Sequence, residues 1–129
     1  MNEVKYGIRE FILGGKSEFT IFQEPNIQEK YKVLKNDSGT VWFIYVGSDY
    51  QGYITKKDLY TTKVGNKKIE NRNDKAVKAL LWVLSHANNL PNAVHVYHHG
   101  KCSICGRKLK DAESLLYGIG PTCRSKGAR

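Results

Sequence analysis

The spacing of three cysteines near the C-terminus is the feature that most constrains how this 129-residue chain can fold. Cys102 and Cys105 form a C-x2-C pair, and Cys123 follows after 17 intervening residues. A C-x2-C pair closes a tight turn that directs both sulfurs at one centre, as tetrahedral Zn²⁺ requires. His99 lies at H-x2-C before the pair and completes a set of three cysteines and one histidine, although the spacing leaves His98 open as the fourth ligand. The sequence therefore predicts a structural Zn²⁺ site formed by Cys102, Cys105, Cys123 and His99.

The segment between the second and third cysteines contains signals for two short helices. Asp111 is suited to cap a helix over 112–117, and Gly118 is suited to end it. Pro121 suits the first position of a final helical turn that carries Cys123. Three thiolates and one Zn²⁺ leave a net negative charge, and nearby cations would offset it: Lys101, Arg107, Lys108 and Lys110.

Other readings of the cysteines stay open at this point. Three buried cysteines without a ligand are one of them, and a redox C-x-x-C is disfavoured because no βαβ pattern surrounds it. A zinc deaminase needs H-x-E and P-C-x-x-C, whereas Gly100-Lys101 precede the pair here. A Cys–His nucleophile pair lacks an orienting partner, and no P-loop, G-x-S-x-G or H-E-x-x-H motif is present. An odd number of cysteines argues against a disulfide framework, so we expect structural zinc and no enzymatic activity.

The first half of the chain contains the patterns of β-strands. Phe19 and Ile21 alternate with polar neighbours, as do Tyr31 and Val33, and Asn36-Asp37-Ser38-Gly39 is typical of a turn. The run TVWFIYV is apolar on both faces, which favours a central strand. The predicted extended segments are 8–13, 17–23, 29–35, 40–46 and 52–55. They predict an antiparallel meander of four or five strands.

A helix follows the meander. Asn73 or Asp74 can cap its N-terminus, and Leu90-Pro91 lies beyond its end. Its broad apolar stripe consists of Ala76, Val77, Leu80, Leu81, Leu84 and Ala87. Trp82 and His86 are expected in the core or at its edge, and a short strand is expected over 93–97. The fold class is α+β: an antiparallel β-meander packed by one main helix over residues 1–92, then a small zinc module with three cysteines and one histidine over residues 93–129.

The net charge of +9 lies in the second half of the chain. Residues 1–55 carry −1, residues 56–78 carry +5 and residues 101–129 carry +5. Such blocks indicate either binding to a phosphate backbone or a solvated surface. The candidate nucleic-acid-binding residues are Lys56, Lys57, Lys67, Lys68, Arg72, Arg107, Lys108, Lys110 and Arg124. Tyr50, Tyr53 and Tyr60 are candidates to stack on bases, or else they pack within the sheet.

The compartment is predicted from what the chain lacks. No apolar run approaches the roughly 18 residues of a membrane span. The charged N-terminus, MNEVKYGIRE, has no signal-peptide core. We therefore expect a cytoplasmic protein with no membrane partner, and the sequence leaves its oligomeric state open.

The C-terminal segment resembles a zinc-finger-like domain of unknown function that is widespread in phage and prophage proteins. The matching motif H-x-G-x-C-x-x-C-G-R-x-L…E-S…G-I-G-P-x-C includes Cys102, Cys105, Gly106, Arg107, Leu109, Glu113, Ser114, Gly118, Ile119, Gly120, Pro121 and Cys123. The phrase FILGGKSEFTI, residues 11–21, is similar to the N-terminal portion of longer phage members. The resemblance implies a phage origin, hence the host cytoplasm, and a zinc-stabilised fold, and it implies no reaction.

Two functions follow as expectations. The first is a zinc-binding accessory protein that binds DNA or RNA through its basic blocks. The alternative is a protein-interaction module that inhibits a host enzyme or defence complex, in which the basic surface blocks a nucleic-acid-facing patch.

Overall fold

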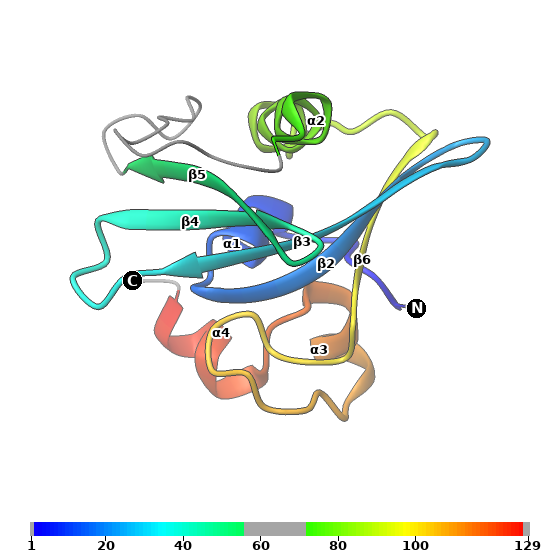
Figure 1. Ribbon diagram of the computed structural model, residues 1–129. Coiled ribbons are helices and arrows are strands. Elements are labelled where there is room, and N and C mark those ends of the chain that lie inside the picture. Colours follow the sequence, from blue (N-terminus) through cyan, green and yellow to red (C-terminus); the bar gives the residue numbers. More distant parts are fainter. Residues whose placement is uncertain (1, 56–71, 128–129) are drawn as a thin grey trace.

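A computed structural model of the protein describes residues 2–55 and 72–127, which form a six-stranded antiparallel sheet and four helices (Figure 1). The strand order is β1-β6-β2-β3-β4-β5. The elements are β1 (Asn2–Glu3), α1 (Ile8–Ile12), β2 (Lys16–Gln23), β3 (Ile27–Lys35), β4 (Val41–Val46), β5 (Asp49–Thr55), α2 (Asp74–Ser85), β6 (Val94–His98), α3 (Ala112–Tyr117) and α4 (Pro121–Gly127). In the described part of the chain no helix is long and apolar enough to cross a membrane.

The predicted meander is confirmed for β2 to β5, in which each strand pairs with the next. Phe19 lies opposite Tyr31, and Val33 lies opposite Ile44; all four are buried. Because side chains alternate along a strand, this register places one continuous apolar layer on one face of the sheet. That layer forms the core with the helices packed on it.

The segment 8–13, expected to be extended, is instead the helix α1. Gly7 enters the helix at φ 64°, a left-handed conformation that favours glycine. Ile8, Phe11 and Ile12 are buried, and their spacing is helical because i, i+3 and i+4 share one helix face. Over so few residues an apolar run fits both the helical and the strand period. The helix forms here because its buried face packs on the sheet.

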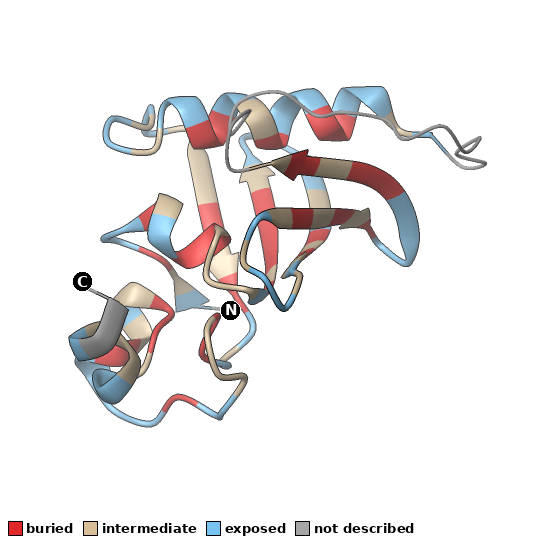
Figure 2. Ribbon diagram, turned by 90° about the vertical axis from the view of Figure 1, so that its left-hand side faces the viewer, coloured by how far each residue is buried: buried red, intermediate tan, exposed pale blue. Residues whose placement is uncertain are grey.

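The predicted helix is confirmed as α2, the longest helix of the described residues. The Asn73 side chain accepts a hydrogen bond from the amide of Ala76 (3.1 Å), which caps its first turn. The Tyr31 hydroxyl on β3 donates to the Ala76 carbonyl (2.7 Å), which ties the helix to the sheet. In Figure 2 the buried residues of α2 face the strands and the exposed ones face away.

Trp82 and His86 were expected in the core or at its edge, and this is wrong. Trp82 is 40% exposed and His86 is exposed, and their rings stack on each other at 4.2 Å outside the sheet. At 100° per residue, both positions lie on the side of α2 opposite Leu80 and Leu84, which are buried. The buried side of α2 therefore consists of aliphatic residues.

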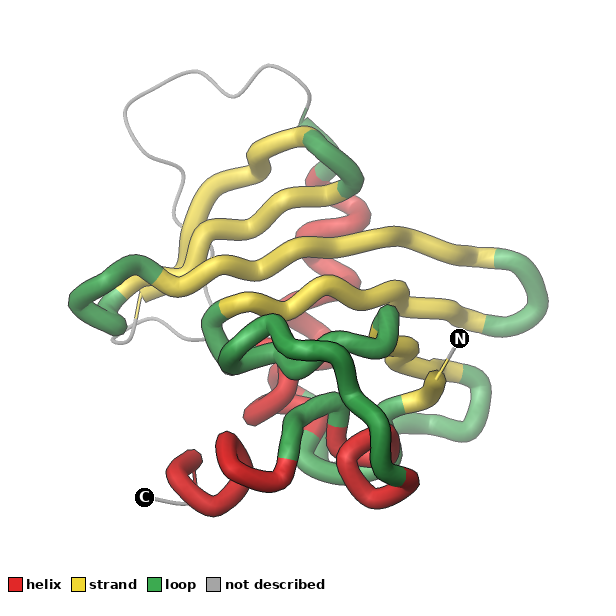
Figure 3. Tube along the Cα trace, turned by 90° about the horizontal axis from the view of Figure 1, so that it is seen from below, coloured by secondary structure: helices red, strands yellow, loops and turns green. Residues whose placement is uncertain are grey.

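The face of the sheet away from α2 is open over β3, β4 and β5 (Figure 3). β6 lies between β1 and β2, so residues 94–98 are part of the main sheet. We call residues 2–55 and 72–98 the sheet body. Residues 99–127, the C-terminal lobe, follow β6 and carry α3 and α4 below the sheet in Figure 1.

Candidate metal centre

Three cysteine sulfurs meet in the C-terminal lobe. The Sγ atoms of Cys102, Cys105 and Cys123 all lie within 4.8 Å of one another, and we call them the cysteine cluster. The first two come from a tight turn in which the amide of Gly106 donates to the carbonyl of Cys102 (2.9 Å). The third comes from α4, which Pro121 begins. The cysteine cluster confirms the sequence prediction that the C-x2-C pair and the distant cysteine converge on one point.

The surroundings of Cys102 fit a thiolate ligand. Cys102 is 1% exposed, and its Sγ accepts hydrogen bonds from the amides of Ile104 and Gly120, each at 3.4 Å. Burial alone would raise its pKa, but the backbone amides of Gly120, Cys105 and Ile104 outweigh burial and leave the pKa below its ordinary value. The thiolate is the form of cysteine that binds a metal. The donor set therefore fits a thiophilic cation such as Zn²⁺.

The third cysteine, Cys123, is less acidic than an ordinary cysteine, and its pKa shift has a clear cause. Burial, followed by its contacts with Cys105 and Cys102, raises the pKa of the Cys123 thiol to about 11. Three sulfurs at this separation disfavour simultaneous ionisation, because their negative charges repel. A divalent cation reverses this effect and deprotonates a coordinating thiol.

The structure does not bring either histidine into the cysteine cluster. The Nε2 atom of His99 lies 3.1 Å from the Thr20 Oγ1 atom on β2. The buried His98 ring accepts at Nδ1 from the Gly100 amide (2.9 Å), so its Nε2–H donates to the Leu115 carbonyl (2.7 Å). Strand alternation explains this placement, because β6 extends through His98, directs that residue into the core and leaves His99 beside β2. The predicted fourth ligand, His99, is therefore placed on the sheet.

The turn that carries the first two cysteines is a basic hairpin. The amide of Cys102 donates to the carbonyl of Arg107 (2.8 Å), and the amide of Leu109 donates to the carbonyl of Gly100 (2.8 Å). Lys101 and Lys108 are bridge partners across it. Its exposed cations are Lys101, Arg107, Lys108 and Lys110, and no described residue forms an ion pair with any of them. We call residues 100–110 the knuckle hairpin.

The other predicted nucleic-acid contacts have different surroundings. Arg72 pairs with Asp74 (3.0 Å) beside the start of α2. Arg124 is half-buried, and its Nη1 donates to the Ile119 carbonyl (2.8 Å) and to the Ser114 hydroxyl (3.0 Å). Arg124 thus holds the C-terminal lobe together. Lys56, Lys57, Lys67, Lys68 and Tyr60 lie outside the described residues.

Two of the predicted stacking tyrosines can be located on β5. Tyr50 is 38% exposed, and Tyr53 is half-buried. The Tyr50 ring contacts that of Tyr45 at 5.4 Å, and burial raises the pKa of the Tyr50 hydroxyl. Both expected roles, stacking on bases and packing in the sheet, remain compatible with partly exposed rings.

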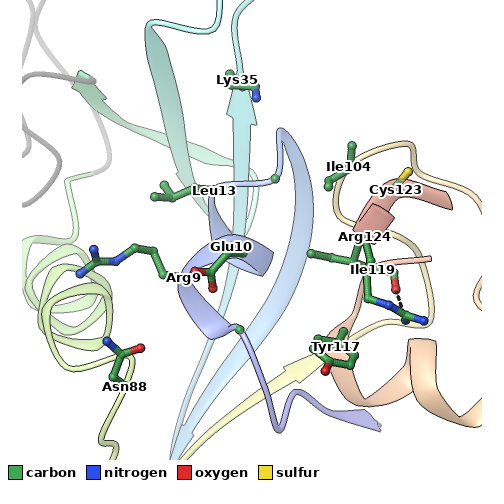
Figure 4. A pocket seen from close by; sticks show the side chains of 12 residues that line it. Arg9, Glu10, Leu13, Lys35, Asn88, Ile104, Tyr117, Ile119, Cys123 and Arg124 are labelled. Carbon is green, nitrogen blue, oxygen red and sulfur yellow. Dashed lines mark hydrogen bonds between the residues drawn. The ribbon is translucent and has the colours of Figure 1, made fainter. Parts of the chain in front are cut away.

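A cavity of about 970 Å³ lies between α1 and the C-terminal lobe (Figure 4). Leu13 lines it from the sheet body, and Ile104 and Cys123 line it from the lobe. The Arg9 guanidinium points toward α2, where it donates to a backbone carbonyl at 3.0 Å. No sequence pattern indicated this cavity, because the segment that forms its wall was expected to be a strand. Cys123 is therefore the member of the cysteine cluster that borders the cavity between the lobe and the sheet body.

One comparison with known proteins gives a match. A family of unknown function (DUF6011) matches residues 93–126, which are 34 of the 129 residues. The matched region spans β6, the cysteine cluster and both helices of the C-terminal lobe, and agrees with the resemblance to a domain of unknown function. No curated protein and no solved structure matches the chain.

Proposed function

We propose that the chain is a phage-type, non-enzymatic accessory protein of the host cytoplasm that binds Zn²⁺ and, through basic surfaces, nucleic acid. The observation that carries this proposal is the knuckle hairpin. Its four cations are exposed and have no acidic partner among the residues that the structure describes. Exposed cations on one short hairpin are typical of a surface that contacts phosphates.

The arrangement of two of these cations costs stability. Lys101 and Lys108 lie directly opposite each other, and like charges in that position are destabilising. A zinc–thiolate centre with a net negative charge offsets part of this repulsion, and bound phosphates would offset more. This cost favours a role in binding an anion over a merely solvated surface.

In this proposal Zn²⁺ has a structural role. Cys102, Cys105 and Cys123 would hold the ion, and it would close the turn that presents the cations. When bound, it supplies a rigid cross-link between the knuckle hairpin and α4, and we assign it no reaction. The position of Cys102 and Cys105 at the turn of the knuckle hairpin supports this role.

The proposal is tested with fluorescently labelled oligonucleotides, single-stranded and double-stranded, titrated by anisotropy at several salt concentrations. The double variant Arg107→Gln, Lys108→Gln should weaken binding to all sequences and reduce the log–log salt slope by about 1 for each phosphate that is no longer neutralised. The matched control is Lys75→Gln, Lys78→Gln on α2, which removes the same charge from exposed positions outside the lobe. The control should change affinity much less.

Absence of binding to either nucleic acid at low salt would overturn the proposal. The remaining candidate would then be the host-protein inhibitor. That function requires a stoichiometric partner in a pull-down from host lysate.

A further inference from the structure

The open face of the sheet has an unusual composition. Its side chains alternate with the buried ones, so β2 contributes Phe22 beside the buried Ile21, and β4 contributes Tyr45 beside the buried Ile44. We define the open face by Phe22, Lys30, Lys32, Phe43, Tyr45, Tyr50, His95 and Tyr97. Figure 3 shows no helix in front of β3, β4 and β5 on this side, and α2 lies behind them.

The rings of the open face form two clusters. In the first, His95 lies between Phe22 and Tyr97, with ring centroids 6.0 and 5.9 Å away and interplanar angles of 28° and 25°. In the second, Tyr50 contacts Tyr45 at 5.4 Å and Phe43 at 6.4 Å. The first cluster lies on β2 and β6, the second on β4 and β5, and β3 separates them.

The separating strand contributes lysines to the open face. Lys30 lies opposite Thr20, and no described acid pairs with it. Lys32 lies opposite Tyr45 and forms an exposed ion pair with Glu18 at 3.4 Å. Such an exposed pair contributes little, so Lys32 can exchange its partner for a phosphate.

The acids at the other end of the open face are engaged as well. Glu3 contacts Lys5 at 2.8 Å and His95 at 2.9 Å. Glu24 lies 3.6 Å from the same imidazole. Glu3 and Glu18 therefore each have a lysine partner, whereas Glu24 contacts the His95 ring. Lys30 lies between the two ring clusters and has no acidic partner among the described residues.

We infer that the open face is a stacking platform for single-stranded nucleic acid. The inference rests on the proposed function and names its ligand class and surface. Bases stack on aromatic rings while a basic groove follows the backbone, and a single strand exposes base faces that a duplex hides. On the open face the two ring clusters would stack on bases, and the lysines between them would contact the phosphates. Protein interfaces are also rich in aromatic residues, but their centres are depleted of lysine, whereas Lys30 and Lys32 lie at the centre of the open face.

The open face is continuous with the knuckle hairpin. His99 follows β6 directly and its ring contacts Thr20 on β2. The knuckle hairpin begins with the next residue, Gly100, so Lys101 lies two residues from a side chain seated against the sheet. A strand bound on the rings would reach the cations of the hairpin, which gives one path for the backbone.

The test removes one ring from each cluster and one from elsewhere. Tyr45→Ala and Tyr97→Ala should each weaken binding of a labelled single-stranded oligonucleotide roughly five- to 150-fold. They should change duplex binding and the salt slope little. Trp82→Ala is the matched control, because Trp82 is an exposed aromatic residue on α2, behind the sheet, and should leave affinity unchanged.

A second pair of variants separates stacking from folding. Tyr45→Phe keeps the ring and should retain affinity, whereas Tyr45→Leu keeps an apolar side chain and should lose it. Circular dichroism and thermal melting of each variant check the fold. Unchanged affinity in folded Tyr45→Ala and Tyr97→Ala would overturn the inference, as would equal losses for duplex and single strand. If Tyr45→Ala and Tyr97→Ala keep their affinity while the double variant Arg107→Gln, Lys108→Gln loses affinity, the stacking inference fails and the proposed function stands. Wild-type protein that binds no oligonucleotide would overturn both.

Discussion

The sheet body and the C-terminal lobe are stabilised in different ways. The sheet body buries side chains completely on the strands and on α2, including Phe19, Val33 and Leu80. Within residues 99–127 the buried apolar side chains are those of Cys102, Leu109 and Ile119. Burial of apolar area supplies most of the free energy of folding, so the sheet body can fold on that basis. The lobe has little apolar area to bury and depends on its sulfur cluster and its contacts with the body.

The largest expected effect is that of removing the proposed Zn²⁺ ion or one of its cysteine ligands. Chelation, or Cys105→Ser, should unfold the C-terminal lobe and leave the sheet body folded, because a structural Zn²⁺ site supplies on the order of 10 kcal/mol of folding free energy. Hydrogen exchange with mass spectrometry measures this directly. Amides in 99–127 should lose protection, and amides in β2 to β5 should keep theirs. Ser125→Ala, an exposed change on α4, is the control and should keep one bound zinc.

A lobe that stays protected after chelation would contradict this expectation. The contacts with the sheet body would then suffice to fold it. The amide of Lys16 donates to the Ser103 carbonyl (2.7 Å), and that bond would be the first contact to remove.

The next largest effect is expected from a substitution where the C-terminal lobe packs closely against the sheet body. Gly118 has φ 67°, and a Cβ there would lie 2.6 Å from Cε1 of Phe11 in α1. Gly118→Ala should lower the free energy of unfolding by about 3 kcal/mol, combining left-handed strain with overpacking. Gly47→Ala is the matched control, because Gly47 has φ 60° and no atom within 4 Å of such a Cβ. It should cost only the strain, about 1 kcal/mol.

Urea denaturation of zinc-saturated protein measures both variants. The difference between them reports the packing of the lobe on α1, since the backbone strain is common to both. Equal losses of unfolding free energy in the two variants would show that the lobe shifts away from Phe11 at little cost. The packing of the lobe on α1 would then contribute little to stability.

A smaller effect concerns the boundary between the two parts. His99→Ala should keep one bound zinc by native mass spectrometry, because the His99 ring contacts Thr20 on the sheet and lies outside the cysteine cluster. Loss of the hydrogen bond to Thr20 should cost about 1 kcal/mol of stability or less. Zinc loss in His99→Ala to the level of Cys105→Ser would show that the ring leaves Thr20 and binds the metal, as the H-x2-C spacing predicted.

Hydrophobic patterns that continue over many residues predicted most of the sheet body correctly. The alternation around Phe19 and Tyr31 identified the buried face, and the pair Asn73 and Asp74 identified the start of α2, because a period or a cap is a local property of the chain. The five residues of α1 are too few to separate a helical period from a run of apolar residues. Trp82 was expected in the core or at its edge, although its position on the helix faces outward.

Convergence in the lobe was predictable only in part. The C-x2-C pair and its distant third cysteine carry a spacing that a metal requires, so their meeting could be expected. The position of His99 depends on how far β6 extends, and one residue more in a strand reverses the direction of a side chain. The open face was missed as a unit, since Phe22, Tyr45 and Tyr97 come together only through a strand order that the sequence does not state.

The smallest expected effect returns to the sheet body and asks where its stability resides. Trp82→Ala should change the free energy of unfolding by about 0.5 kcal/mol, because Trp82 is 40% exposed and its ring stacks on the exposed His86 ring. Leu80→Ala, two residues away and fully buried, should cost about 2–5 kcal/mol. Urea denaturation of the two variants therefore compares the inner and outer sides of one helix. A cost above about 3 kcal/mol for Trp82→Ala would be that of a core aromatic residue, and would mean that the outer side of α2 is covered in the folded protein.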